Sequence, residues 1–387
     1  MTAAPARARD DAAPLPRICL CGPIAEAGAA ARGGYQACNR RSIEALRHAG
    51  IDVVALPYPH PHARGWRKQI EYALGFLRLY GRVLGCERGA ILHLTALAAH
   101  FVYNEWPLLH LARLRGLRIV YDLRAGAGQT QYEARGALYR WTFRSCLRSA
   151  HELLIEGEAL RPFIERVARR AALHLPNHID TDALPWRDTT GALPAAPTIA
   201  YVGRIVAEKG IETVLETARL LRRRGLEVRL LVAGDGDADY LNRLHEMAGE
   251  IDVRWLGPLS SMAVLALWRE AHFFVFPTRH VGEGQSNALT EAMACGCVPI
   301  ASRHGFNEAA IGEAALTLPV DAHASAYAAT LHQLWPAAWP ALSLRMQQRA
   351  RDRFSTAAAL RTLLGVYRRA ARLPAPAEPA LATPPEH

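Results

Sequence analysis

Short apolar runs alternate with longer amphipathic stretches along the whole chain. Short runs rich in Val, Ile and Leu are typical of parallel strands buried on both faces, and amphipathic stretches are typical of helices that cover such a sheet. Strands that alternate with helices predict an α/β fold made of doubly wound, Rossmann-like domains. The predicted strands are 18–22, 51–57, 91–94, 117–123, 152–157, 198–203, 227–234, 253–257, 272–277 and 297–302.

The pattern stops and restarts once, which divides the chain into two. Residues 179–197 are rich in proline and polar residues and are predicted to be a linker. Domains are expected at 16–178 and 198–354, because 387 residues with 50% hydrophobic content are enough for two cores. A final amphipathic helix is predicted at 355–372, and we expect it to cross back to the N-terminal domain.

The two ends of the chain and its cysteines restrict the class of protein. Residues 1–15 and 373–387 carry proline and alanine without an apolar pattern and are predicted to be a disordered lead-in and tail. The lead-in has no apolar signal segment, so we expect a cytoplasmic protein. The most apolar long run, 90–103, falls short of the ~20 residues that span a bilayer. The seven cysteines form no Cys-x-x-Cys pair and are expected to be buried, reduced thiols.

The formal net charge of +10 is concentrated in the first half of the chain. Residues 1–180 hold 25 Lys and Arg against 15 Asp and Glu, whereas residues 181–387 hold 21 against 21. This excess favours an acidic partner for the N-terminal half, and nucleic acid, a phosphate-bearing substrate and an anionic membrane surface all qualify. The alternative is that the excess only reflects an Ala- and Arg-rich composition, with the charges solvated on the surface and no specific partner.

The stretch "GEGQSNALTEAMACG", residues 282–296, places Glu283 and Glu291 on either side of a predicted helix start. Ser286 or Asn287 is a natural N-cap, and Gly296 is a natural stop. Loop amides and a helix N-terminus are favourable for an anion, whereas carboxylates accept hydrogen bonds from neutral hydroxyl groups. A sugar nucleotide supplies both kinds of group.

Two cations point to the same ligand. Arg204 and Lys209 lie in the loop after the predicted strand 198–203, where the carboxyl end of a parallel sheet places ligands. Guanidinium and ammonium groups at such a site can hold a diphosphate. In the first half, Gly33 and Gly34 precede a helical pattern and could bring backbone amides to an anion, although a plain turn is the default for a lone Gly-Gly pair.

Taken together, these motifs resemble the retaining GT-B-fold glycosyltransferases of family 4. The resemblance is specific over about residues 176–315 and looser upstream. It rests on "PNHID" at 176–180, "GRIVAEKG" at 203–210, "LVAGDGD" at 231–237, "WLGPLS" at 255–260, "FPT" at 276–278, "EGQSNALTEAMACGCVPIAS" at 283–302 and "GFNEAAIG" at 305–312.

The resemblance implies a GT-B fold, in which two Rossmann-like domains face a central cleft. The N-terminal domain would be the acceptor side and the C-terminal domain would bind the donor nucleotide. Arg204 and Lys209 would bind the donor diphosphate and stabilise it as it leaves, Glu291 would accept from the ribose hydroxyls, and Glu283 would lie beside the transferred sugar. The remaining donor contacts would come from Gly284, Gln285, Ser286 and Asn287, and from Gly33 and Gly34 across the cleft.

The sequence departs from the family pattern at one place. Many members carry a histidine after an N-terminal strand, near the reacting sugar, whereas "VYDLRAGAG" offers Tyr121, Asp122 and Arg124 here. Asp122 is the best catalytic substitute, and a structural acid paired with a nearby arginine is the alternative. His93 is more simply a core histidine. We expect no metal, because no acidic pair is placed to hold one.

A segment at 66–85 bears on the acceptor. It puts apolar residues on one helical face with Arg and Lys among the remainder; the face consists of Trp66, Ile70, Ala73, Leu74, Leu77, Tyr80 and Leu84. Such a helix most simply packs on its own sheet. The alternative is a peripheral contact with an anionic membrane, which would bring the enzyme to a lipid-linked acceptor.

The sequence therefore predicts a cytoplasmic, metal-independent, retaining glycosyltransferase, working at the inner face of the membrane if its acceptor is lipid-linked. The donor would be a nucleotide-diphosphate sugar of hexose type, and the product a cell-envelope polysaccharide or lipopolysaccharide. One rival is a catalytically silent sugar-nucleotide-binding protein of the same fold. Another is a basic nucleic-acid-binding protein, which would explain the charge but neither Glu283 nor Glu291.

Overall fold

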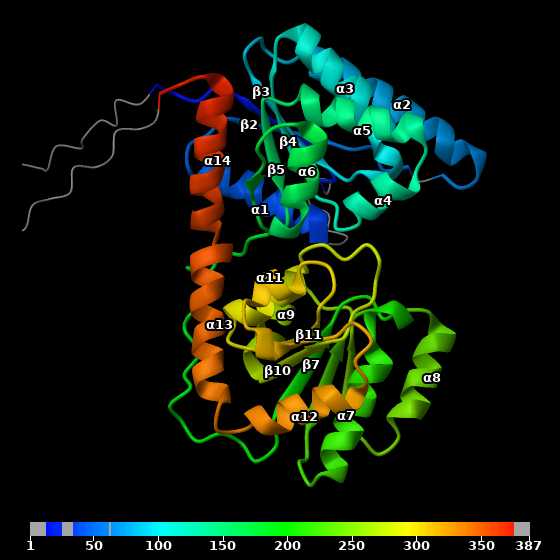
Figure 1. The fold of residues 1–387 in the computed structure, drawn as a ribbon, viewed down its shortest axis with the longest axis vertical. Helices are drawn as coiled ribbons and strands as arrows, with labels where there is room; N and C mark the ends of the chain where they lie inside the picture. Colours follow the sequence, from blue (N-terminus) through cyan, green and yellow to red (C-terminus); the bar gives the residue numbers. More distant parts are fainter. Residues whose placement is uncertain (1–12, 25–33, 62, 375–387) are drawn as a thin grey trace, which may run out of the picture.

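A computed structural model describes residues 13–24, 34–61 and 63–374. Two α/β domains lie one above the other, and the long α13 and α14 run along one side of both (Figure 1). Each domain is built on a six-stranded sheet whose paired strands are all parallel, as the strand pattern predicts. The expected α/β fold of two doubly wound domains is confirmed.

The N-terminal sheet has the strand order β2-β1-β3-β4-β5-β6. Each predicted strand of this half is present, and the additional β6 is only two residues long, too short to leave a pattern in the sequence. The strands are β1 (Ile18–Gly22), β2 (Val53–Pro57), β3 (Ile91–Ala96), β4 (Arg118–Leu123), β5 (Glu152–Ile155) and β6 (Leu173–His174).

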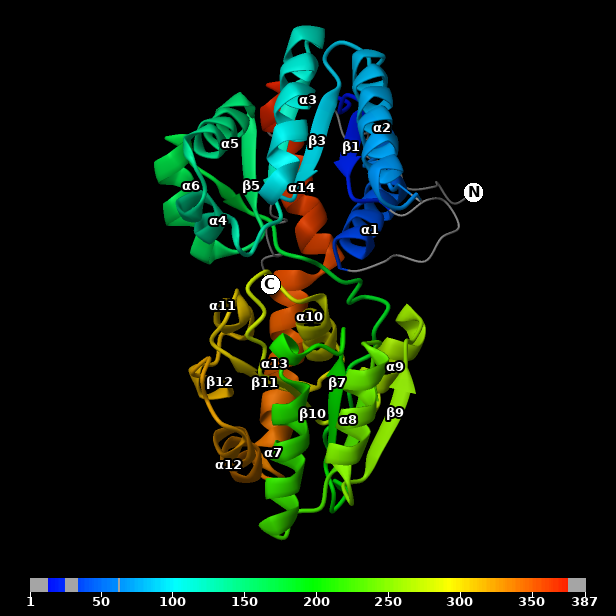
Figure 2. The same ribbon diagram turned by 90° about the vertical axis from the view of Figure 1, so that its right-hand side faces the viewer.

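Helices cover both faces of this sheet. Three long helices, α2, α3 and α5, lie side by side over one face together with α6, while α1 and α14 cover the other (Figures 1 and 2). The helices of this half of the chain are α1 (Gly34–His48), α2 (Trp66–Leu84), α3 (Val102–Arg115), α4 (Gly128–Ala134), α5 (Ala137–Ser149) and α6 (Arg161–Ala168).

The helix α2 packs with a different face from the one predicted. Its buried residues are Phe76, Leu79 and Val83, whereas Trp66 is 70% exposed and Leu77 is 61% exposed. The prediction that the face containing Trp66 and Leu77 packs on the sheet is therefore wrong. Two apolar stripes share this helix, and the aromatic-rich stripe around Phe76 fills the core.

The C-terminal sheet has the order β12-β11-β10-β7-β8-β9. Its strands are β7 (Thr198–Val202), β8 (Arg229–Ala233), β9 (Val253–Gly257), β10 (Phe273–Phe276), β11 (Val298–Ser302) and β12 (Thr317–Leu318). Its helices are α7 (Ile211–Arg223), α8 (Ala238–Ala248), α9 (Ser261–Glu270), α10 (Asn287–Ala294), α11 (Asn307–Ile311), α12 (Ala324–Leu334) and α13 (Trp339–Phe354).

The strand order determines where a ligand can bind. From β7 the chain moves outward to β8 and β9, and then returns to place β10 on the other side of β7. The loops after β7 and β10 therefore diverge at the carboxyl edge of the sheet, where open α/β sheets bind ligands in a crevice between such loops. Arg204 and Lys209 belong to the first loop, and Glu283 belongs to the second.

The chain crosses between the domains twice at the same place. At the first crossing, Ile179 donates its amide to the carbonyl oxygen of Phe354 at 2.8 Å and accepts from the amide of Thr356 at 2.9 Å. At the second, Ser355 separates α13 from α14 (Thr356–Ala371), and α14 returns to the N-terminal sheet (Figure 2). The expected return of the C-terminal helix is confirmed.

Candidate functional site

The loops after β7 and β10 meet through an ion pair. Lys209 Nζ lies 2.5 Å from Glu283 Oε2, and the hydroxyl of Thr278 donates to the same oxygen at 2.9 Å. Both charged side chains are mostly buried, with 14% exposure for Lys209 and 8% for Glu283. The cation and carboxylate singled out from two separate motifs therefore form one unit at the crevice.

Arg204 lies at the same edge of the sheet with its side chain exposed. The described part of the chain offers it no ion-pair partner. Burial lowers the pKa of the His280 imidazole, and the positive charges of Lys209 and Arg204 lower it further. Both cations therefore lie near His280, a site neighbour that the sequence motifs did not identify, and Arg204 is free to meet an anion.

The helix α10 starts between the two acids, as predicted. Ser286 is its N-cap residue, Asn287 is its first residue, and Gly296 follows its end with a φ of 76°. Glu291 lies one turn into the helix, where its Oε1 is 3.3 Å from a guanidinium nitrogen of Arg41 in α1. Burial raises the pKa of Glu291, and the positive charge of Arg41 opposes this shift.

The N-terminal domain faces this helix directly. Asn287 Nδ2 donates to the backbone oxygen of Gly34 at 2.9 Å, which places Gly34 on the opposite wall as the resemblance implied. Gly33 lies outside the described residues. The loop after β4 approaches even more closely, because a Cβ on Gly126 would lie only 2.1 Å from the backbone oxygen of Glu283. Only glycine permits this contact between the two domains.

Gln285 links the loop after β10 to the domain crossing. Its Oε1 accepts from the amide of Asn177 at 2.8 Å, and its Nε2 donates to the carbonyl oxygen of Asn177 at 3.1 Å. The side chain of Asn177 completes the contact by donating to the backbone oxygen of Gln285 at 2.8 Å. Gln285 therefore positions the loop and the neighbouring Gly284. Its side-chain amide is already hydrogen-bonded to the backbone of Asn177 without any ligand.

Glu156, directly after β5, is a site neighbour that the sequence analysis missed. It is 1% exposed; its Oε1 accepts from Asn177 Nδ2 at 2.9 Å, while Oε2 has no partner among the described residues. A Cβ on Gly284 would lie 2.5 Å from that Oε2. Burial raises the pKa of Glu156 to about 7, against the lowering effect of Arg124. The sequence does contain a signal for Glu156, because it is an acidic residue directly after an apolar strand.

Asp122 belongs to a closed internal network. It has no exposed surface, and its Oδ2 lies 2.7 Å from a guanidinium nitrogen of Arg124 and 3.4 Å from His93 Nε2. Arg124 also donates to Asn177 Oδ1 at 2.9 Å, and His93 Nδ1 bonds the hydroxyl of Tyr367 in α14 at 2.7 Å. This geometry agrees with the structural alternative for Asp122, whose Oδ1 has no partner among the described residues. Its catalytic assignment stays a prediction.

The arrangement can bind an anion and several hydroxyl groups at once. Arg204, Lys209 and the amides at the start of α10 offer positive potential, and Glu283 and Glu291 offer acceptors. Within the described ranges, no group of three or more His, Cys, Asp or Glu side chains is placed to hold a metal ion. Nor does that part of the chain contain a helix both long and apolar enough to cross a membrane.

Comparison with known proteins finds a family match in the C-terminal domain. Residues 196–336 match the family described as glycosyl transferases group 1. A phosphatidyl-myo-inositol mannosyltransferase of Mycobacterium tuberculosis is 28% identical over 199 residues, which are 48% of this chain and 52% of the relative. An α-D-kanosaminyltransferase of Streptomyces kanamyceticus is 28% identical over 34% of this chain and 39% of its own. The chain thus spans about half, or less, of the length of these curated relatives.

A third relative and two solved structures extend the comparison. A GDP-mannose:cellobiosyl-diphosphopolyprenol α-mannosyltransferase of Xanthomonas oryzae is 29% identical over 36% of this chain and 37% of its own. The structure of sucrose-phosphate synthase from Thermosynechococcus elongatus has a TM-score of 0.72 at 19% identity, covering 92% of this chain and 98% of that one.

An Anabaena protein solved with UDP-glucose gives a TM-score of 0.63 at 13% identity, over 90% of this chain and 98% of its own. At these identities the structures establish the shared fold across both domains, a GT-B fold. The family match covers the domain that holds Arg204, Lys209, Glu283 and Glu291. That domain, over residues 196–336, is similar to the family described as glycosyl transferases group 1.

Proposed function

We propose that this protein is a retaining glycosyltransferase that moves a hexose-type sugar from a nucleotide-diphosphate donor to a glycan or lipid-linked acceptor. The observation that carries the proposal is the Lys209–Glu283 pair beside the start of α10, with Glu291 one turn further on. Retention is taken from the resemblance to family 4. The matches to glycosyltransferases over the donor-side domain support the activity.

Each group of the site has a chemical role in this reaction. As the sugar–phosphate bond breaks, negative charge grows on the diphosphate and positive charge grows on the sugar ring. Lys209, Arg204 and the amides at the start of α10 stabilise the leaving diphosphate electrostatically, without a metal. Glu291 accepts from the ribose hydroxyls. Glu283 accepts from hydroxyls of the transferred sugar and holds Lys209 in position before the donor arrives.

The acceptor side of the proposal rests on α2 and on the relatives. Trp66, Leu74 and Leu77 leave an apolar stripe of α2 exposed. An exposed amphipathic helix on a basic domain favours a peripheral contact with an anionic membrane at its cytoplasmic face. One relative is named as acting on phosphatidyl-myo-inositol and another on a diphosphopolyprenol. We therefore favour a lipid-linked acceptor in cell-envelope polysaccharide or lipopolysaccharide synthesis.

A panel of nucleotide sugars tests the donor assignment. Thermal shift in the presence of each sugar nucleotide should identify one donor that raises the unfolding temperature. Incubation of that donor with membrane extracts, with and without a chelator, should then transfer labelled sugar at equal rates. Loss of transfer with the chelator would contradict metal independence. Tight donor binding without transfer to any extract would favour the catalytically silent sugar-nucleotide-binding protein instead.

A further inference from the structure

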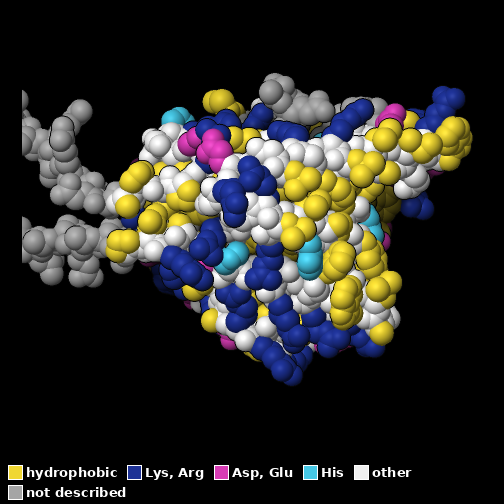
Figure 3. Space-filling model, turned by 90° about the horizontal axis from the view of Figure 1, so that it is seen from above, with side chains coloured by type: hydrophobic (Ala, Val, Ile, Leu, Met, Phe, Trp, Pro, Cys, Tyr) yellow, Lys and Arg dark blue, Asp and Glu magenta, His cyan; other side chains and the backbone are white. Residues whose placement is uncertain are grey.

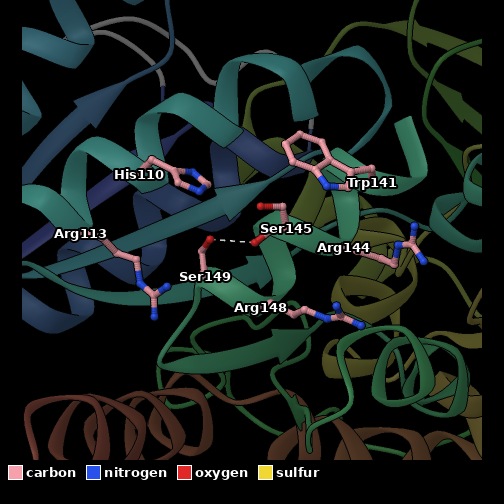
Figure 4. A pocket seen from close by; sticks show the side chains of 7 residues that line it. All are labelled: His110, Arg113, Trp141, Arg144, Ser145, Arg148 and Ser149. Carbon is pink, nitrogen blue, oxygen red and sulfur yellow. Dashed lines mark hydrogen bonds between the residues drawn. The ribbon is translucent and has the colours of Figure 1, made fainter. Parts of the chain in front are cut away.

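The outer layer of the N-terminal domain has a basic pocket that the proposed reaction does not use. The pocket lies between α3 and α5 and has a volume of about 420 Å³. In Figure 4, Arg113, Trp141, Arg144 and Arg148 lie around Ser145 and Ser149, with the guanidinium groups at the edge of the pocket and the Ser149 hydroxyl donating to the backbone oxygen of Ser145 at 2.7 Å. A pocket of this size is large enough for a phosphate-bearing headgroup.

The pocket is remote from the crevice between the domains. Arg113 is in the last turn of α3, just before β4 begins, and Arg148 is in the last turn of α5, just before β5 begins. The pocket therefore opens toward the amino ends of the strands, whereas the donor crevice lies at the carboxyl ends of the C-terminal strands. A ligand bound here cannot be the sugar donor.

The positive charge of the pocket is not balanced by acids. Arg113, Arg144 and Arg148 form no ion pair within the described residues, whereas the C-terminal-domain arginines Arg222 and Arg229 each pair with two carboxylates. A neighbouring cavity of about 250 Å³ shares Arg144 and Arg148 and adds Arg166 and Arg169, with Glu133 as its one acidic lining residue. Like-charged side chains gathered without acidic partners in the described residues favour an external anion.

Two further observations agree with an anion at this place. Burial lowers the pKa of the nearby His151, and together with the positive charges of Arg118 and Arg113 it brings that pKa to about 4. Ser145 Oγ accepts from Trp106 Nε1 at 2.9 Å, which leaves its own proton available for a phosphate oxygen. Guanidinium groups bind phosphate oxygens in pairs, so three arginines and a hydroxyl suit a phosphate better than a carboxylate.

Exposed apolar side chains lie beside the arginines. Trp141 is 51% exposed, and Leu138 and Leu114, on the same two helices, are 67% and 83% exposed. Figure 3 looks down on this domain and shows Lys and Arg side chains gathered along its lower part, with hydrophobic side chains to the right. Arginine beside exposed tryptophan and leucine is typical of surfaces that enter a membrane interface, whereas a nucleic-acid backbone gives leucine no partner.

We propose that the pocket between α3 and α5 binds the phosphate of anionic phospholipid headgroups, and that it orients the acceptor-side domain on the membrane. The proposal rests on the membrane contact given above for α2 and adds a second, chemically distinct point of attachment. Because α2, α3 and α5 lie in one layer, the apolar stripe of α2 and the pocket can face one membrane surface together.

Vesicle binding by the full chain tests this site. We expect co-sedimentation with vesicles of phosphatidylcholine and phosphatidylglycerol, and little with phosphatidylcholine alone. Arg144→Ala combined with Arg148→Ala should weaken binding about thirtyfold, at about 1 kcal/mol for each basic residue near the surface. The matched control, Arg223→Ala combined with Arg224→Ala, removes two exposed arginines that form no ion pair in the described C-terminal domain and should leave binding unchanged.

The failures of the two proposals are distinguishable. An equal loss of vesicle binding in the control variant would overturn the proposed headgroup site but not the membrane contact of α2. The same holds if the α3–α5 pocket variant binds vesicles fully while Leu77→Ser in α2 abolishes binding. Displacement from vesicles by inorganic phosphate far below the matched chloride concentration would assign the pocket to free phosphate. If the α3–α5 pocket variant lost binding to an oligonucleotide but kept its binding to vesicles, the proposal of a lipid-headgroup site would also be overturned. Thermal shift by the donor nucleotide should be the same in every variant.

Discussion

Each domain places an ion pair at the carboxyl ends of its central strands, and the two pairs differ in access. Asp122 lies near the end of β4 and Arg124 directly follows the strand; their side chains are 0% and 5% exposed. Lys209 and Glu283, after β7 and β10, are 14% and 8% exposed and border the crevice. The first pair has Asn177 and His93 as further partners, whereas the second has Thr278 and keeps part of Lys209 exposed.

The difference shows how similar pairs of residues can serve opposite purposes. A buried pair contributes through the large cost of breaking it, because the remaining charge is left without water or partner. A pair at the edge of a crevice can exchange partners when an anion binds. Breaking it therefore costs little stability, and its position affects ligand binding and the reaction instead. The comparison can be tested by removing one member from each pair.

The largest effect on stability is expected from Asp122→Asn. This change leaves Arg124 as a buried cation without a carboxylate, and the free energy of unfolding should fall by about 3–5 kcal/mol. Chemical denaturation measures the loss. Asp252→Asn is the matched control, because Asp252 pairs with Arg229 at 3.5 Å on the surface and should cost less than about 1 kcal/mol. An Asp122→Asn variant with normal stability and no turnover would support the catalytic assignment.

Lys209→Ala should mainly affect the reaction. Loss of one preorganised cation beside the leaving diphosphate should reduce kcat by about a hundredfold to a thousandfold, with a smaller change in donor affinity. Steady-state kinetics with the identified donor provides the measurement. Arg223→Ala, which removes an exposed charge from α7, serves as the control. Unchanged kcat, or a stability loss as large as that of Asp122→Asn, would show that the two pairs do not differ as described.

The pH dependence of stability tests the closed network through Glu156→Gln. The pKa of Glu156 is raised from 4.5 to about 7 in the folded protein, so folding takes up a proton at this residue. Its stabilising contribution is complete below about pH 4.5 and is lost as the pH rises through 7, by up to about 3 kcal/mol. Urea unfolding of both chains should therefore favour the variant increasingly as the pH rises. Parallel stability curves would contradict the raised pKa.

The smallest expected effect is that of Glu291→Ala. Loss of an acceptor for the ribose hydroxyls should weaken binding of the nucleoside diphosphate about tenfold, with little change in kcat. Calorimetric titration measures the affinity. Arg41→Ala removes the partner of Glu291 in the other domain and separates the two roles of this acid. Equal weakening by both variants would mean that the contact between the domains, and not the ribose, determines the affinity.

Much of the donor side could be predicted because local signals there agree with one another. The apolar runs identified the long strands, and Ser286 and Gly296 marked the ends of α10. The acceptor side required information that a sequence pattern does not contain. Periodicity finds apolar stripes on α2 but does not say which of them packs, and Phe76 fills the core while Leu77 faces solvent. Likewise, the partners of Asp122 and Glu156 come from distant segments that only the fold brings together.

The return of α14 has a consequence for protein synthesis. Ala359, Leu363 and Val366 of α14 complete the apolar layer under one face of the N-terminal sheet. The ribosome makes residues 18–174 of that sheet first, but the helix that covers it emerges only after the whole C-terminal domain. Domains generally fold as units in the order in which they emerge. Here the earlier domain must wait with part of its core open, so the domain that is made first is completed last.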